Sequence, residues 1–156
     1  MQAFERSEPD PVGNYPVNAG NALFRPIGPS VLVVEDEEMI LKVLRLLFAG
    51  EGYTVFDAAT QSEAVALEKS IPGGVDLLLA DVGLKQGSGP GAAEEIRKNH
   101  PDVDVVFMSG YGREELVKHG VIGAGERFLK KPFNIKAFRE FIRNQCNPAF
   151  PGTGAK

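Results

Sequence analysis

The sequence is poor in cysteine, in long apolar runs and in charge of one sign, and each shortage excludes a class of protein. Cys146 is the only cysteine among 156 residues, which excludes an intrachain disulfide and a cysteine-rich zinc site. No apolar run approaches the ~18 residues of a membrane helix, and the N-terminus lacks the apolar core of a signal peptide. We therefore expect a soluble protein without membrane insertion, and a reducing cytoplasm fits its cysteine content.

The composition that remains is that of an ordinary globular domain with irregular ends. Lysine and arginine number 17 against 21 aspartates and glutamates, and a net charge of −4 predicts no broad basic surface for nucleic acid. Hydrophobic residues make up 43% of the chain, enough for a core. Residues 1–29 contain five prolines and no helical or strand period, which is typical of an arm or linker. Residues 148–156 form a similarly irregular tail, leaving 30–147 as the predicted domain.

Strand-like and helix-like segments alternate through this domain. Five short runs rich in apolar and β-branched residues predict strands, at residues 31–34, 53–58, 75–81, 103–109 and 126–132. Because each strand is followed by a helical segment, the pattern predicts an α/β domain with a parallel sheet. Right-handed crossovers would then place helices on both faces, as a three-layer sandwich.

The helical segments carry their own signals. The first has apolar residues at helical spacing, namely Ile40, Val43, Leu44 and Leu47. Thr60 followed by Glu63 has the form of a capping box, which opens the second. A glycine-rich loop, 83–91, leads into the third, and the fourth, around 114–121, is expected to be short. In the last helix we expect three apolar residues to face inward, namely Ile135, Phe138 and Ile142.

Polar residues stand where these predicted strands end. The first strand runs into Glu35 and Asp36, the third ends at Asp81, the fourth at Ser109 and the fifth at Lys131. Ligands of parallel α/β sheets collect at the carboxyl edge of the strands, so we expect these side chains to converge there. Lys130 and Lys131 cannot both point to the site, because successive side chains alternate along a strand; with Lys131 at the site, Lys130 is left at the surface.

Three converging carboxylates require shared protons or a cation. Oxygen ligands without histidine or cysteine favour a hard ion such as Mg²⁺, which is often bound by a few carboxylates together with phosphate oxygens. An aspartate beside such an ion stays ionised and can attack phosphorus as a nucleophile. A lysine and a hydroxyl would neutralise the remaining phosphoryl oxygens. The residue inventory therefore predicts aspartyl phosphorylation.

Four motifs resemble those of a known family, the receiver domain of two-component response regulators. They are VLVVEDEE (31–38), DLLLADVGL (76–84), FMSGYG (107–112) and FLKKPF (128–133). The resemblance implies a flavodoxin-like (βα)5 fold with strand order 2-1-3-4-5. It also implies that the domain takes a phosphoryl group from a histidine kinase or a histidine phosphotransfer protein. It implies further that the domain catalyses only its own aspartyl phosphorylation and dephosphorylation and is otherwise not an enzyme.

The resemblance assigns a role to each site residue. Asp81 is the implied phosphoacceptor, Asp36 a direct Mg²⁺ ligand and Glu35 a ligand through water, while Gly83 would add its backbone carbonyl; Mn²⁺ could replace Mg²⁺. Lys131 would contact the phosphoryl group, and its bond to Pro132 resembles the family's cis peptide. Ser109 and Phe128 are the implied switch pair, whose movement would change partner binding.

Several alternatives stay open. A degenerate receiver would act only as an interaction module, and an aspartyl-phosphate phosphatase would turn over small substrates, although Gly83 stands where such enzymes frequently carry a second aspartate. The domain is either a stand-alone regulator or the receiver of a hybrid kinase, and phosphorylation-dependent homodimerisation is unresolved. Lys85 replaces a proline that the family commonly has in the loop after Asp81, which leaves the rigidity of this loop open.

Overall fold

A computed structural model of the chain describes residues 28–146 as five strands and five helices in strict alternation. The strands are β1 (Ser30–Val34), β2 (Thr54–Ala58), β3 (Leu77–Asp81), β4 (Asp104–Ser109) and β5 (Arg127–Lys130). The helices are α1 (Glu38–Gly50), α2 (Gln61–Glu68), α3 (Gly89–Asn99), α4 (Arg113–Lys118) and α5 (Ile135–Gln145). All strand pairs are parallel, in the order β2-β1-β3-β4-β5, which confirms the predicted fold.

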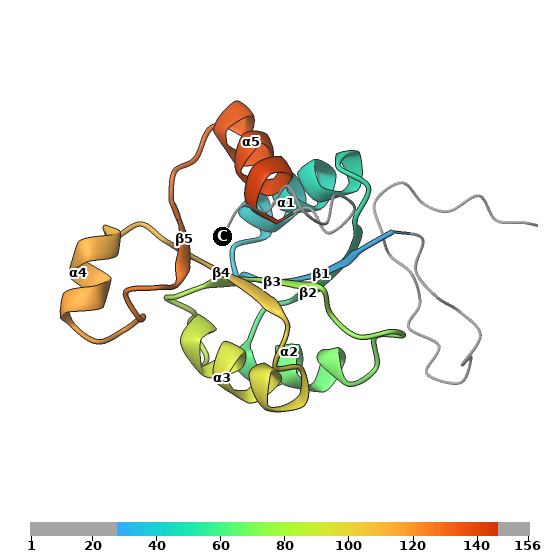
Figure 1. The fold of residues 1–156 in the computed structure, drawn as a ribbon, viewed down its shortest axis with the longest axis horizontal. Coiled ribbons are helices and arrows are strands. Elements are labelled where there is room, and N and C mark those ends of the chain that lie inside the picture. The colour runs from blue at the N-terminus through green and yellow to red at the C-terminus, as the bar shows by residue number, and fades with distance from the viewer. Residues whose placement is uncertain (1–27, 147–156) are drawn as a thin grey trace, which may run out of the picture.

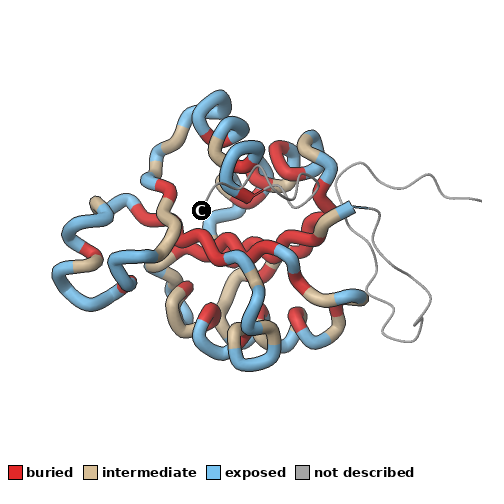
Figure 2. The backbone as a smooth tube through the Cα atoms, in the orientation of Figure 1, coloured by how far each residue is buried: buried red, intermediate tan, exposed pale blue. Residues whose placement is uncertain are grey.

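The sheet lies between two layers of helices (Figure 1). Helices α1 and α5 cover one face and α2 and α3 cover the other, whereas α4 lies out beyond the β5 edge. The central strands are the most deeply buried part of the molecule, as the burial colours show (Figure 2). The predicted three-layer sandwich is thus present, with α4 displaced from the layer it would otherwise complete.

Strand alternation divides the apolar interior into two cores. Val31 and Val33 of β1 point to the core under α1 and α5, whereas Leu32 and Val34 point to the core under α2 and α3. All four residues have no exposed surface, which is why β1 reads as a continuous apolar run rather than as an alternating one. Central parallel strands require this pattern because both of their faces are covered.

The buried face of α1 differs from the predicted one. Val43 is 42% exposed and Ile40 is half-buried, so two of the four residues predicted to face the core do not do so fully. The face that packs on the sheet consists of Leu41, Leu44, Leu47 and Phe48. The Phe48 ring anchors this orientation through edge contacts with Tyr53 and Phe138, at centroid distances of 5.2 Å and 5.3 Å.

Two further expectations for the helices need correction. Ile135 is 53% exposed, because it is the first residue of α5, while Phe138 and Ile142 are buried one and two turns later as predicted. Helix α3 begins at Gly89, inside the segment expected to be a loop up to residue 91. The Ser88 side chain makes this early start favourable, because it accepts a hydrogen bond of 3.0 Å from the Gly91 N–H.

The other helix signals are confirmed. Glu63 N–H donates to Thr60 Oγ1 at 3.1 Å, as in the predicted capping box, although the Glu63 carboxylate returns to the Ala59 N–H rather than to that of Thr60. Helix α4 spans only Arg113–Lys118, so it is short as expected. No helix in the described part of the chain is long and apolar enough to cross a membrane.

The predicted irregular ends fall almost entirely outside the described residues. Of the arm at 1–29, only residues 28 and 29 are described, and the whole tail at 148–156 lies beyond the described range. The arm and the tail therefore stay predictions.

Candidate functional site

Three carboxylates predicted to converge do meet at the carboxyl edge of the sheet. Glu35 continues the β1 ladder, since its N–H donates to Ala58 O at 3.0 Å, and Asp36 follows it directly. Asp81 is the last residue of the neighbouring strand β3. One oxygen from each of these acids lies within 4.8 Å of the others. Glu35 and Asp81 are buried and Asp36 is half-buried, so this is a recessed acidic site.

Lys131 joins two of the three acids. Its Nζ lies 2.8 Å from Glu35 Oε2 and 2.9 Å from Asp81 Oδ2. Its backbone is placed by a hydrogen bond of 2.8 Å from its N–H to Ser109 O, and its peptide bond to Pro132 is cis, as the resemblance implied. The neighbouring Lys130 is exposed, as strand alternation predicted. Lys131 therefore offsets part of the negative charge of the acids.

Backbone donors complete the site, one for each acid. The Glu37 N–H donates to Glu35 Oε1 at 3.0 Å and the Gly83 N–H to Asp81 Oδ1 at 3.2 Å. Asp36 Oδ2 accepts from the Lys85 N–H at 2.7 Å. Each carboxylate thus has a donor that offsets part of its charge. The Lys85 contact was not foreseen, because a backbone donor leaves no trace in the side-chain sequence.

The environment shifts the pKa of the central ion pair. Burial raises the pKa of Glu35, and the nearby Asp81 charge adds to this effect, while the hydrogen bonds from Lys131 and Glu37 oppose it. Burial alone would lower the pKa of Lys131, but its hydrogen bonds to Glu35 and Asp81 outweigh burial and raise it. Lys131 is therefore a firmly protonated partner for these acids at neutral pH.

The remaining predicted site residues are Ser109, Phe128 and Gly83, which come from β4, β5 and the loop after β3. Ser109 ends β4 and is buried, with its Oγ accepting a 3.0 Å hydrogen bond from the Tyr111 N–H. Phe128 is half-buried in β5, paired in register with Phe107 of β4, and packs against the core under α2 and α3. Gly83 is exposed in the loop after β3. The structure thus places Lys131 in contact with Glu35 and Asp81, with Asp36 close to both of these acids, and Ser109 beside Lys131 through the backbone.

The donor set fits a hard divalent cation. All the candidate ligand atoms are carboxylate oxygens, and they come from two adjacent strand ends, so the cage is built on rigid elements. A magnesium site also retains room for water and for phosphoryl oxygens, which agrees with the partial exposure of Asp36. The acidic cluster is therefore a chemically suitable Mg²⁺ site.

An apolar groove of about 580 Å³ lies next to the acids. It is bounded by the first turns of α1 and by the segment that follows β5, and its lining includes Met39, Val43, Lys131 and Phe133. Met39 is 75% exposed, and Leu46, one turn beyond Val43, is 61% exposed. These three apolar residues recur at helical spacing, so α1 presents an apolar stripe to solvent beside the acidic site.

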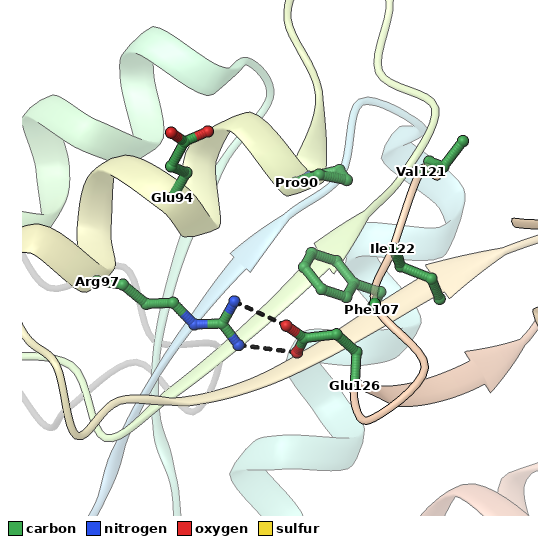
Figure 3. Close-up of a pocket in the computed structure, with 8 residues that line it drawn as sticks. Pro90, Glu94, Arg97, Phe107, Val121, Ile122 and Glu126 are labelled. Atoms are coloured by element: carbon green, nitrogen blue, oxygen red, sulfur yellow. Dashed lines mark hydrogen bonds and ion pairs between the residues drawn. The ribbon is translucent and has the colours of Figure 1, made fainter. Parts of the chain in front are cut away.

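A second pocket, of about 240 Å³, lies between α3 and the segment before β5 (Figure 3). The Arg97 guanidinium closes one side by binding both carboxylate oxygens of Glu126, at 2.9 Å and 2.8 Å. Phe107 and Ile122 form its apolar floor. None of the three acids is among the residues that line this pocket.

The sequence matches the family model of the response regulator receiver domain over residues 31–143. The fold, the edge position of the acids and this match define the class, and the chain belongs to the response regulator receiver family of two-component signalling.

Relatives of two architectures match the chain. It is 36% identical over 114 residues to the sensor kinase CckA of Brucella abortus, covering 73% of this chain but only 12% of that protein. It is 33% identical over 113 residues to the chemotaxis protein CheY of Treponema pallidum, covering 72% of this chain and 78% of that protein. The chain thus corresponds to a small part of the first relative and to most of the second.

Solved structures agree with this assignment. The receiver domain of the hybrid histidine kinase CckA superposes with a TM-score of 0.63 at 31% identity, covering 76% of this chain and 99% of that one. A chain of the CheX–CheY–BeF3–Mg²⁺ complex from Borrelia burgdorferi gives a TM-score of 0.64 at 28% identity, covering 75% and 89%. These matches confirm the fold expected from the sequence.

Proposed function

We propose that this receiver domain accepts a phosphoryl group on Asp81 in a phosphorelay. The observation that carries the proposal is the contact of Lys131 Nζ with both Glu35 and Asp81, inside a triad of acids whose oxygens lie within 4.8 Å of one another. Three acids and one lysine have an unbalanced negative charge that a divalent cation offsets. Glu35, Asp36 and Asp81 would hold Mg²⁺ or Mn²⁺, together with the Gly83 carbonyl.

The bound metal would keep Asp81 ionised and offset the charge of the phosphoryl oxygens. A carboxylate oxygen of Asp81 forms the new bond to phosphorus as the bond from phosphorus to the donor histidine nitrogen breaks. The electron pair of the broken bond stays on that imidazole nitrogen. Lys131 has three N–H donors and uses two of them on Glu35 and Asp81, so the third can reach a phosphoryl oxygen.

The switch would follow from the new charge on Asp81. Ser109 at present accepts a hydrogen bond from the Tyr111 N–H, and its hydroxyl proton can be donated to a phosphoryl oxygen once the side chain turns toward the site. Phe128 is only half-buried, and an inward turn would bury the ring in the space that Ser109 leaves. We expect such a movement to change the surface around β5 and α4.

The phosphodonor must reach a recessed acid, and the apolar stripe of α1 offers a surface for it. Met39, Val43 and Leu46 are exposed on one side of the helix that starts at the acidic site. A helical phosphohistidine protein, either a kinase or a phosphotransfer protein, would cover this stripe with its own apolar side chains. This contact would place its imidazole over Asp81.

The relatives support both architectures considered from the sequence. Similarity to CckA favours the receiver of a hybrid kinase, and similarity to CheY favours a stand-alone regulator. In either case we propose a cytoplasmic signalling module that catalyses only its own phosphorylation and dephosphorylation. Phosphorylation-dependent homodimerisation remains a further part of the proposal.

Intact-mass analysis after incubation with acetyl phosphate and Mg²⁺ tests the function. We expect one added phosphoryl group on the wild-type protein, none on Asp81→Asn and none when EDTA replaces Mg²⁺. An unmodified wild-type protein would favour the degenerate, interaction-only alternative. Modification that persists in Asp81→Asn would show that another residue is the acceptor. Steady turnover of a generic phosphoester by the wild type would support the phosphatase alternative instead.

A further inference from the structure

The loop after β3 touches a proposed metal ligand through its backbone. The Lys85 N–H donates to Asp36 Oδ2 at 2.7 Å, so the position of this loop sets the orientation of Asp36. Lys85 occupies the position where the family commonly has proline, and a proline there would lack this donor. Without proline, other contacts must hold the loop backbone in the conformation in which the Lys85 N–H reaches Asp36.

Gln61, the first residue of α2, makes such contacts with the loop. Its side-chain Oε1 accepts a hydrogen bond of 3.0 Å from the Ser88 N–H, and its backbone N–H donates to Gln86 O at an N to O distance of 3.3 Å. These two hydrogen bonds, called the Gln61 clamp below, hold the loop at Gln86 and Ser88, one and three residues after Lys85. One residue of α2 thus fixes the backbone of the segment that carries the donor to Asp36.

Gln61 is itself rigidly placed, because it lies inside the capping box of α2. Glu63 N–H donates to Thr60 Oγ1, and the Glu63 carboxylate accepts from the Ala59 N–H at 2.9 Å, which locks the residues on either side of Gln61. The clamp therefore starts from a fixed helix end rather than from a second loop.

The loop sequence is fitted to this side chain. Gly87 adopts a φ of +77°, and a Cβ built at that position would collide with Gln61 Cβ. A Cβ at Gly91, in the first turn of α3, would collide with Gln61 Oε1. Two glycines thus leave the space that Gln61 fills, and at Gly87 the backbone conformation also requires glycine.

We propose that Gln61 is a positioning residue for the metal site, acting through the loop 83–88 and the Lys85 N–H on Asp36. The proposal rests on the proposed function, in which Asp36 binds Mg²⁺. Partners that orient a metal-binding side chain influence affinity without touching the metal, and Gln61 would do so at one step further removed. The clamp would replace the stiffness that proline gives to this loop in other receivers.

Amide hydrogen exchange in the metal-free protein tests the clamp itself. We expect Gln61→Ala to speed exchange of the Lys85 and Ser88 amides by about fivefold or more, the equivalent of one net hydrogen bond. Gln61→Glu keeps an acceptor oxygen at the same reach and should retain the wild-type rates. Ser62→Ala is the control within the same exposed turn, because it removes only the 3.3 Å hydroxyl contact of Ser62 with Thr60 and leaves Gln61 and the bond from the Glu63 N–H to Thr60 Oγ1 in place. Unchanged Lys85 exchange in Gln61→Ala would overturn the proposal.

Mg²⁺ titration of the same variants, with Mn²⁺ as a spectroscopic probe, tests the effect on the site. Gln61→Ala should weaken Mg²⁺ binding by about fivefold, with Gln61→Glu and Ser62→Ala near the wild type. Lys85→Pro removes the donor and should weaken binding by about tenfold, whereas Lys85→Ala keeps the N–H and should not. If Gln61 acts through this donor, Gln61→Ala will add nothing in the Lys85→Pro background.

The outcomes separate the two levels of the argument. Wild type that binds no Mg²⁺ would refute the proposed function, and the inference with it. If the wild type binds Mg²⁺ and Gln61→Ala binds it with the same affinity, the inference is overturned while the proposed function stands. This holds even if Gln61→Ala speeds the exchange of the Lys85 amide. Additive losses in the double variant would show that Gln61 acts by a route other than the Lys85 N–H. Thermal melts followed by circular dichroism confirm that each variant is folded at the temperature used.

Discussion

Lys131 is the direct ionic partner of Glu35, a carboxylate with no exposed surface at all: the Nζ atom lies 2.8 Å from Oε2. The lysine comes from the end of β5 and the glutamate from the end of β1, 96 residues earlier in the chain. Because these strands are separated by β3 and β4 in the sheet, the ion pair spans its carboxyl edge. Removal of either charge leaves the other in a poorly solvated place.

Lys131→Ala should destabilise the metal-free protein at neutral pH. The variant leaves the buried Glu35 beside Asp81 without a cation, and loss of one partner of a buried pair costs about 3 kcal/mol. Urea unfolding followed by circular dichroism at pH 7 measures the loss. Lys130→Ala is the control, since its side chain is exposed and one residue away. Equal stability of the two variants would contradict the burial argument.

The same pair predicts a pH dependence. The folded pKa of Glu35 is raised above 4.5, so its contribution to stability is present below that pH and is lost as the pH rises through the folded pKa. The folded pKa of Lys131 is raised above 10.5, so its contribution persists until the pH exceeds that value. Removal of Lys131 raises the pKa of Glu35 further. The Lys131→Ala destabilisation should therefore be smaller at pH 4 than at pH 7.

Asp36→Ala and Glu38→Ala separate the metal site from the helix start. Mg²⁺ at about 100 times its Kd should raise the unfolding free energy of the wild type by about 2.7 kcal/mol. Asp36→Ala should lose most of this gain, because Asp36 contributes one of three clustered carboxylates. Glu38→Ala should keep it, since Glu38 lies exposed in the first turn of α1. Thermal melts with and without Mg²⁺ report both results.

Equal Mg²⁺ responses in Asp36→Ala and wild type would contradict the ligand assignment. In metal-free buffer Asp36→Ala removes one of three mutually repelling charges but also the acceptor of the Lys85 N–H, so the two effects oppose each other and the stability should stay near that of the wild type.

The sequence predicted the fold and the acids for a common physical reason. Parallel strands end at one edge of the sheet, so residues that follow separate strands, such as Glu35 and Asp81, must meet there. Strand alternation allowed only one of Lys130 and Lys131 to reach the site, and the bond of Lys131 to Pro132, which resembles the family motif, selected Lys131. The short α4 and the α2 cap followed from local patterns, whereas the strand order came from the resemblance to the receiver family.

What the sequence did not predict depends on backbone atoms and on packing angles. The Lys85 N–H that binds Asp36 has no sequence signature, and neither has the grip of Gln61 on the loop. The rotation of α1 was also missed, because Val43 and Leu44 are equally apolar and helical spacing alone admits both faces. The choice between them is made by aromatic contacts of Phe48 with residues distant in the chain.

Arg97→Lys should weaken the link between α3 and the segment before β5. Arg97 binds both oxygens of Glu126, and a lysine cannot reproduce this paired geometry (Figure 3). Because the Arg97 side chain is 38% exposed, we expect a coupling energy of only about 1 kcal/mol. A double-mutant cycle of Arg97→Lys with Glu126→Gln measures it by urea unfolding. Additive single-site effects would show that the pair contributes no stability.

The apolar stripe of α1 should matter for a protein phosphodonor and not for a small one. Met39→Gln and Val43→Thr, made together, preserve side-chain size and add no charge beside the acids, but they replace apolar atoms on the groove next to Lys131. Phosphorylation by acetyl phosphate should keep its wild-type rate. Transfer from a purified histidine kinase or phosphotransfer protein that phosphorylates the wild type should slow by about tenfold, because buried anchor residues dominate such interfaces.

Val121→Thr provides the matched control for the stripe. Val121 is 38% exposed and lines the pocket between α3 and the segment before β5, away from α1, so both transfer rates should remain at the wild-type value. Equal slowing by acetyl phosphate and by the protein donor in the α1 variant would place the defect in the acidic site itself. An unchanged rate from the protein donor would remove the stripe from the docking surface.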